Sequence, residues 1–232
     1  MNMRACLAAL AVATAMAPSG AAAQETIKSL EDKTVEVRPG RVIRDSSELA
    51  RQNYRDFLDL ASTDPELQAE ALRRLGDLEL EAHEADQLAS NVESLDLRGF
   101  DNAAELYQRL LEAYPDYRRN DTVLYQLSRA YEAGGRTDEA LDVLNDLVQR
   151  YPDTEILDEV QFRRGEMLFL RKKFNDAELA YQDVVKAGEQ SRYYEQSLYK
   201  LGWSQFKLAW YEDSLAPFFD LLDRKIKGTE IS

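Results

Sequence analysis

The chain has 232 residues, and its 43 Asp and Glu side chains outnumber its 29 Lys and Arg, which gives a net charge of −14 at pH 7. An acidic surface repels phosphate backbones, so this balance disfavours nucleic-acid binding. One cysteine and one histidine leave few groups for disulfides, cysteine-based catalysis or a metal site.

The first 23 residues predict a secretory signal peptide. Arg4 precedes an apolar run from Cys6 to Met16, and small residues follow at 21–23. This run of 11 residues is much shorter than the roughly 20 that span a bilayer, so cleavage before Gln24 is favoured over a membrane anchor. Cys6 lies inside the run, which does not support a lipid-modified amino terminus. We therefore expect a soluble mature chain, without a transmembrane segment, in a bacterial periplasm.

Residues 24–45 show no helical pattern and predict an extended tether with a turn at Pro39-Gly40. A helix is then expected over residues 46–64, capped by Ser46 or Ser47 and ending before Pro65. Its apolar residues recur on one face, which indicates a half-repeat that covers the first face of an array. That face consists of Leu49, Ala50, Tyr54, Phe57, Leu58 and Ala61.

From residue 66 onward, four helix-pair units share one register. The clearest runs from Asp121 to Thr154, with Gly134-Gly135 as the turn between its two helices. In each unit a glycine or serine recurs in the first helix, and a small residue precedes a large one by four positions in the second. The units are 66–116 with a helical insertion around 81–99, 121–154, 158–191 and 195–228.

This 34-residue pattern resembles the tetratricopeptide repeat (TPR) family. The resemblance implies an all-α, TPR-type α-solenoid of stacked antiparallel helix pairs with a right-handed superhelix. Each pair has an apolar stripe that it cannot bury alone, so stacking builds a continuous core.

The last predicted helix contains a proline and an excess of large apolar residues. Pro217 requires either a helix that starts late, near Ser214, or a kink. The apolar residues point in several directions and include Leu215, Phe218, Phe219, Leu221, Leu222 and Ile226. We expect the array to continue beyond Ser232, or a partner or a second copy of the chain to cover this helix.

The TPR resemblance also implies a binding groove, lined by fixed positions of each first helix. In this sequence these positions include aromatic and arginine side chains, a composition typical of protein-binding hot spots. The alternative is that the rings pack between units. The candidate groove residues are Arg73, Tyr125, Arg129, Phe162, Phe169, Tyr199, Trp203 and Phe206.

No catalytic or cofactor-binding pattern accompanies the repeats. His83 shares a helical face with Glu79 alone, too few ligands for a closed metal site. We therefore expect no catalytic residue, metal or cofactor, and we predict that the chain is not an enzyme.

Two short phrases, Tyr151-Pro-Asp-Thr154 and Phe162-Arg-Arg-Gly165-Glu166, are similar to those of periplasmic TPR proteins of the BamD/CpoB type. The favoured function is a periplasmic scaffold or adaptor that binds a segment of another cell-envelope protein in its concave groove. Two alternatives stay open: a structural spacer or amino-terminal module of a larger envelope protein, and the helical platform of a cell-wall hydrolase whose catalytic domain lies elsewhere.

Overall fold

A computed structural model describes residues 44–60, 64–89 and 98–230. These residues all belong to one compact unit, Ile43–Ser232. The predicted signal peptide, the tether as far as residue 43 and most of the loop expected after the insertion lie outside the described residues. Within the described ranges, no helix is both long and apolar enough to cross a bilayer.

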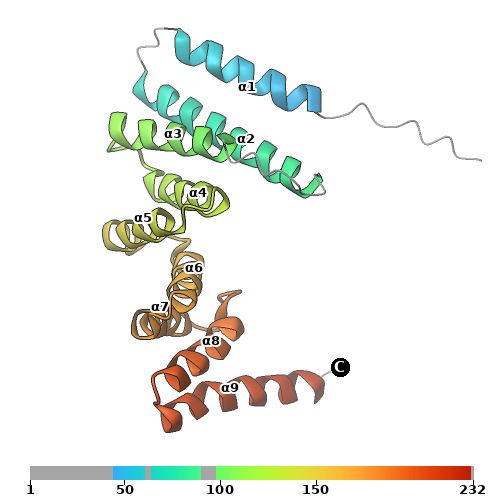
Figure 1. Cartoon of the computed structure of the whole chain (residues 1–232), viewed down its shortest axis with the longest axis vertical. Helices are drawn as coiled ribbons and strands as arrows, with labels where there is room; N and C mark the ends of the chain where they lie inside the picture. The colour runs from blue at the N-terminus through green and yellow to red at the C-terminus, as the bar shows by residue number, and fades with distance from the viewer. Residues whose placement is uncertain (1–43, 61–63, 90–97, 231–232) are drawn as a thin grey trace, which may run out of the picture. The chain divides into compact units, whose positions relative to one another are not determined.

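The described residues form nine α-helices and no strand. Each helix packs against the next one in the chain, as Figure 1 shows. Helices α2 and α3, α4 and α5, α6 and α7, and α8 and α9 form the pairs, whereas α1 is unpaired and packs mainly on α2. The helices are α1 Arg44–Asp59, α2 Pro65–Ala89, α3 Arg98–Ala113, α4 Asn120–Ala133, α5 Thr137–Arg150, α6 Leu157–Leu170, α7 Phe174–Ala187, α8 Tyr194–Lys207 and α9 Tyr211–Glu230.

Within the pairs, a residue without a bulky side chain in the first helix receives a large side chain from the second. A Cβ placed on Gly76 would lie 2.7 Å from the Tyr107 ring, and one on Gly165 would lie 2.6 Å from the Tyr181 ring. Both rings are fully buried. In the α4–α5 pair the second helix supplies Leu144 instead of a ring, and the first helix can carry Ser128. The recurring small and large residues therefore meet at the contact between the paired helices, where there is no room for a larger side chain on the first helix.

The turn inside three of the pairs has the same backbone conformation. Gly135, Lys172 and Ala209 adopt φ values of 75°, 59° and 62°. In each turn, the backbone N–H of the residue that follows this position donates to a carbonyl in the last turn of the first helix. Trp210, for example, donates its N–H to the Gln205 carbonyl at 2.9 Å. Only the first turn has the glycine that this left-handed conformation favours. Two of the three turns therefore carry no glycine signal in the sequence.

Two local predictions for α1 are wrong. Helix α1 begins at Arg44, so Ser46 and Ser47 lie inside the helix and do not cap it. Leu49, which the pattern assigns to the apolar face, is 62% exposed.

At the other end of the array, the structure excludes one of the two alternatives predicted for Pro217. Helix α9 begins at Tyr211, so it does not start late near Ser214 and the proline lies inside it rather than in its first turn. The ring is buried. A proline there removes one helical hydrogen bond, because it has no N–H.

Candidate functional site

The first helices of neighbouring units contact one another through residues at the predicted groove positions. The Tyr125 hydroxyl of α4 donates to Glu159 of α6 at 2.8 Å. Arg129 of α4 pairs with Glu84 of α2 at 2.5 Å. Helices α2, α4 and α6 therefore share a face, which we call the first-helix face. Helix α8 belongs to the same face, because Lys200 of α8 pairs with Glu166 of α6.

Arg73 does not line an open groove. Its side chain is 4% exposed and pairs with Glu70 at 2.6 Å and with Asp77 at 2.7 Å. The hydrogen bond from Arg73 lowers the pKa of the Glu70 carboxyl to about 2. Tyr117 supplies a second hydrogen bond to the same carboxylate, at 2.5 Å. This guanidinium is fully engaged by its own helix and is not free for a ligand.

Buried tyrosines of the second helices satisfy carboxylates on the first-helix face. Tyr107 donates to Asp77 at 2.8 Å, and Tyr181 donates to Glu166 at 2.5 Å. Burial, together with these carboxylates, raises the pKa of both phenols, so they stay protonated donors at neutral pH. The sequence pattern identifies the two rings as packing residues but does not show that their hydroxyls bond to groove carboxylates.

Phe162 and Phe169 are half-buried and pack within the array. Phe162 stacks on Tyr193, with 4.8 Å between the ring centroids and 21° between the planes. Phe169 meets the edge of Phe174 at 5.2 Å. The ammonium of Lys200 lies 5.3 Å from the Phe169 ring centroid and pairs with Glu166 at 2.9 Å. The Lys200 contacts connect α8 to α6 on the first-helix face.

Helix α8 brings together the three remaining predicted residues. Trp203 lies 6.2 Å from Tyr199 and 5.6 Å from Phe206, both edge-on. Two rings of α9 complete the group: Phe218, 6.0 Å from Trp203, and Tyr211, 5.3 Å from Phe206. We call these five residues the α8 aromatic cluster.

The α8 aromatic cluster is the most open part of the predicted groove. Tyr199 is 46% exposed and Phe206 is 44% exposed, and Trp203 is half-buried. The rings hold one another in edge-to-face contacts, which fixes their positions without covering them. Rigid aromatic area of this kind favours protein or peptide binding.

The α8 aromatic cluster consists of aromatic rings only. Across the described part of the chain, no three His, Cys, Asp or Glu residues are placed to hold a metal ion. His83 packs against Phe100 with 6.0 Å between ring centroids. The exposed rings of the cluster offer a surface that can bind and orient an apolar segment.

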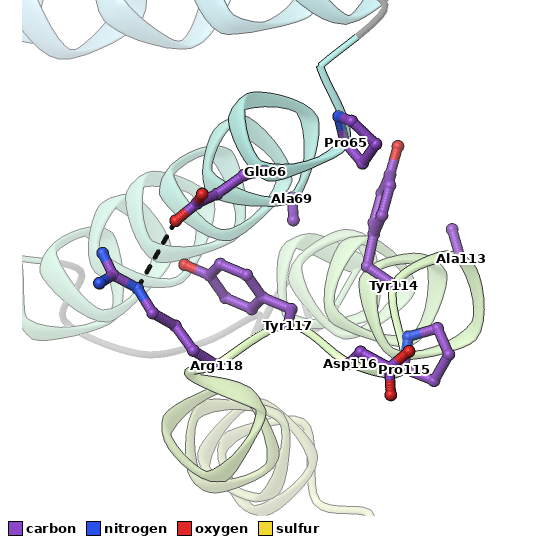
Figure 2. Close-up of a pocket in the computed structure, with 9 residues that line it drawn as sticks. All are labelled: Pro65, Glu66, Ala69, Ala113, Tyr114, Pro115, Asp116, Tyr117 and Arg118. Carbon is purple, nitrogen blue, oxygen red and sulfur yellow. Dashed lines mark ion pairs between the residues drawn. The ribbon is translucent and has the colours of Figure 1, made fainter.

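A separate cavity of about 460 Å³ lies between the start of α2 and the α3–α4 connection. Figure 2 shows Tyr117 directed toward α2, beside the ion pair that joins Glu66 and Arg118 at 3.7 Å. Tyr114 and Pro65 lie on its other side. Sequence reasoning did not indicate this cavity, because its walls come from segments about 50 residues apart and no motif links them.

Comparison with known proteins identifies the repeat. Residues 95–161 match a family model described as a tetratricopeptide repeat. Two structures titled "Crystal structure of MamA protein" and "Crystal structure of MamA" are both 14% identical to this chain and cover 81% of it. The match covers 87% and 93% of those chains, with TM-scores of 0.59 and 0.57. No curated protein matches the sequence.

These findings confirm the predicted fold class. The chain is an all-α, TPR-type solenoid of stacked helix pairs. The hand of its superhelix remains a prediction. At 14% identity, the structural likeness shows the fold alone and assigns no partner.

Proposed function

We propose that this TPR-type solenoid is a non-enzymatic scaffold of the bacterial cell envelope. It binds a segment of another envelope protein on its first-helix face, at the α8 aromatic cluster. The observation that supports this function is the contiguous set of three α8 rings, two of them nearly half exposed on an otherwise well-packed face.

The energetics of the cluster fit a docking site. Covering a large apolar side chain contributes roughly 1.5–3 kcal/mol, and the rings of the cluster are already ordered, so little side-chain entropy is lost on binding. Elsewhere on the face, Arg129, Tyr125 and Glu166 are engaged in contacts between units. Specificity is therefore concentrated at the α8 end of the array.

The periplasmic location of the protein is part of the proposal and is tested separately. The charged start, short apolar run and small-residue end of residues 1–23 support export and cleavage. Mass spectrometry of the protein from fractionated cells should find an amino terminus at Gln24 in the periplasmic fraction. Recovery of the uncleaved chain in the cytoplasm would contradict it.

Trp203→Ala tests the binding face. The substitution removes the central ring of the cluster, so partner binding should weaken about tenfold or more. Partners are captured on the immobilised chain from periplasmic extract of the native host and quantified by mass spectrometry. The matched control is Leu179→Ala, which truncates an exposed leucine of α7 outside the cluster.

The two variants give distinguishable results. Partners that disappear with Trp203→Ala and remain with Leu179→Ala support binding at the cluster. Equal recovery with both variants, at unchanged helicity by circular dichroism, would exclude the cluster as the binding site.

A further inference from the structure

The first junction between units differs from the two that follow it. A junction here is the connection from the second helix of one unit to the first helix of the next. In the α5–α6 connection, Thr154 donates to Asp121, in the first turn of α4, at 2.6 Å. In the α7–α8 connection, Ser191 likewise donates to Asp158, in the first turn of α6. In both junctions, a hydroxyl of the connection is thus bonded to a carboxylate of the preceding first helix.

The first junction, the α3–α4 connection, has the same backbone course as the second. The Tyr117 N–H donates to the Tyr114 carbonyl at 3.1 Å, and the Thr154 N–H donates to the Tyr151 carbonyl at 3.3 Å. Both connections also begin with the sequence Tyr-Pro-Asp. Tyr117 is therefore the equivalent of Thr154, and Tyr114 is the equivalent of Tyr151.

The carboxylate of the later junctions is missing from the first. Ala69 occupies in α2 the position of Asp121 in α4, because each lies seven residues before the small residue that faces the second helix. Tyr117 donates instead to the next residue, Glu70, at 2.5 Å. The cavity of about 460 Å³ lies at this junction, and Ala69 lines it. The first junction therefore has a cavity at the point where a hydrogen bond closes the later two.

The walls of this cavity are mainly rings. Figure 2 shows the Ala69 methyl group between the rings of Tyr114 and Tyr117. Pro65 and Pro115 add two further rings. The volume lies in the range of known ligand sites, roughly 300–1,000 Å³. Because the Tyr117 hydroxyl is already bonded to a carboxylate, these walls suit an apolar ring better than a sugar or an anion.

Charged side chains surround the cavity at the protein surface. Glu66 and Asp116 carry two negative charges, and Arg118, which pairs with Glu66 at 3.7 Å, carries one positive charge. All three side chains are exposed. The whole chain has a net charge of −14. The excess of negative charge beside the rings favours a ligand with a cationic group.

We propose that this cavity binds a proline-rich segment of another protein that has a basic residue next to its prolines. Proline rings dock in grooves lined by aromatic rings, and a polyproline II segment is already extended, so little conformational entropy is lost. The basic residue lies against Glu66 and Asp116. The six prolines within these 232 residues are all separated in the sequence, so they form no proline-rich run. The site shares no residue with the α8 aromatic cluster and does not depend on binding there.

A labelled peptide tests the class of ligand. The probe is a fluorescein-labelled peptide of six prolines followed by two arginines. Fluorescence anisotropy with the full chain should show saturable binding, at least tenfold tighter than that of a peptide with alanines in place of the prolines. No saturable binding at high micromolar chain concentration, or equal binding of the alanine peptide, would overturn the proposal.

A substitution in each of two junctions locates the site. Tyr114→Ala removes one aromatic wall of the cavity and should weaken binding of the proline peptide about tenfold or more. Tyr151→Ala, at the equivalent position of the next junction, is the matched control and should leave binding unchanged. Circular dichroism checks that both variants are folded. Equal weakening by the two substitutions would overturn the assignment to this cavity.

A graft of the second junction onto the first should close the cavity. Ala69→Asp together with Tyr117→Thr supplies the two groups that bond in the second junction, Asp121 and Thr154. This double variant should lose peptide binding at unchanged helicity, and retained binding would overturn the proposal. Because Ala69 is buried, the Tyr114→Ala result decides if the double variant does not fold.

A reversal of charge tests the basic residue of the ligand. Glu66→Lys together with Asp116→Lys should weaken binding of the arginine-ended peptide about threefold, as expected for exposed ion pairs. A peptide of six prolines followed by two glutamates should then bind more tightly than the arginine-ended one. An unchanged preference for arginine would overturn the assignment of a basic residue. Sedimentation velocity that finds a dimer abolished by Tyr114→Ala would assign the cavity to a second copy and overturn the proposal.

Discussion

Glu70 is the most heavily engaged carboxylate on the first-helix face. It accepts hydrogen bonds from Arg73, Arg74 and Tyr117. The Arg73 hydrogen bond is the main reason that its pKa falls from 4.5 to about 2. Because the folded-state pKa lies below the unfolded-state value, the ionised group stabilises the fold above pH 4.5. That stabilisation is lost as the pH falls toward 2.

Glu70→Gln should therefore lower the free energy of unfolding at pH 6 by about 1 kcal/mol, after allowance for solvent screening of a partly exposed group. The difference from the unsubstituted chain should shrink below pH 4.5 and vanish near pH 2. Urea denaturation followed by circular dichroism at several pH values measures it. Glu81→Gln, an exposed change on the same helix, is the control. If the difference in free energy of unfolding stays constant down to pH 2.5, the ionised Glu70 carboxylate is not its cause.

The contact between paired helices depends on a match between one residue without a side chain and one ring. Gly165→Ala would bring a Cβ to 2.6 Å from the Tyr181 ring, so the helices must separate or the ring must move. Overpacking of this kind costs about 1–3 kcal/mol. Thermal unfolding of Gly165→Ala should show a free energy of unfolding that is lower than that of the unsubstituted chain by this amount.

A compensating pair of substitutions isolates the cause. The α4–α5 pair already combines Ser128 with Leu144 at the equivalent positions. Gly165→Ser together with Tyr181→Leu therefore places the same combination of side chains in the α6–α7 pair. The double variant should be more stable than Gly165→Ser alone. Simple additivity of the two changes would mean that the glycine has another role, such as a backbone requirement.

The sequence predicts these paired helices well, because the residues that define them recur at fixed positions. Gly76, Gly165 and Gly202 oppose Tyr107, Tyr181 and Phe218, a match of small to large that can be counted in the sequence. The turns are less predictable. Lys172 and Ala209 adopt the left-handed conformation because the flanking helices impose it. The start of α1 at Arg44 and the position of Pro217 inside α9 also differ from what local sequence signals predict.

The candidate site is only partly predictable, for a related reason. The period correctly places Tyr199, Trp203 and Phe206 together on α8. It cannot show which groove residues the next unit covers, because those contacts join residues about 30 positions apart, as between Phe162 and Tyr193. Whether a groove residue is free or engaged therefore depends on contacts between units, which vary from one unit to the next.

Across the whole described unit, the helices that lie close along their backbones are neighbours in the chain, apart from α2 with α4. Side-chain contacts also join α4 to α6 and α6 to α8. Stability in such an array is approximately the sum of the unit stabilities and the interfaces between adjacent units. A weakened end unit should therefore open alone, whereas a weakened central unit affects the units on both sides of it.

Leu144→Ala and Phe218→Ala, at equivalent positions of two units, test whether an end unit opens alone and a central unit does not. Leu144 is fully buried in the central pair, so its truncation should cost about 2–5 kcal/mol and increase exchange throughout α3–α7. Phe218 is half-buried in the last pair, so Phe218→Ala should increase exchange in α8 and α9 while α4–α6 stay protected. Hydrogen–deuterium exchange read by mass spectrometry resolves the helices separately. Uniform deprotection of all helices by Phe218→Ala would show that the array unfolds as a single cooperative unit, because a local change at the end could then reach α4 only through global opening.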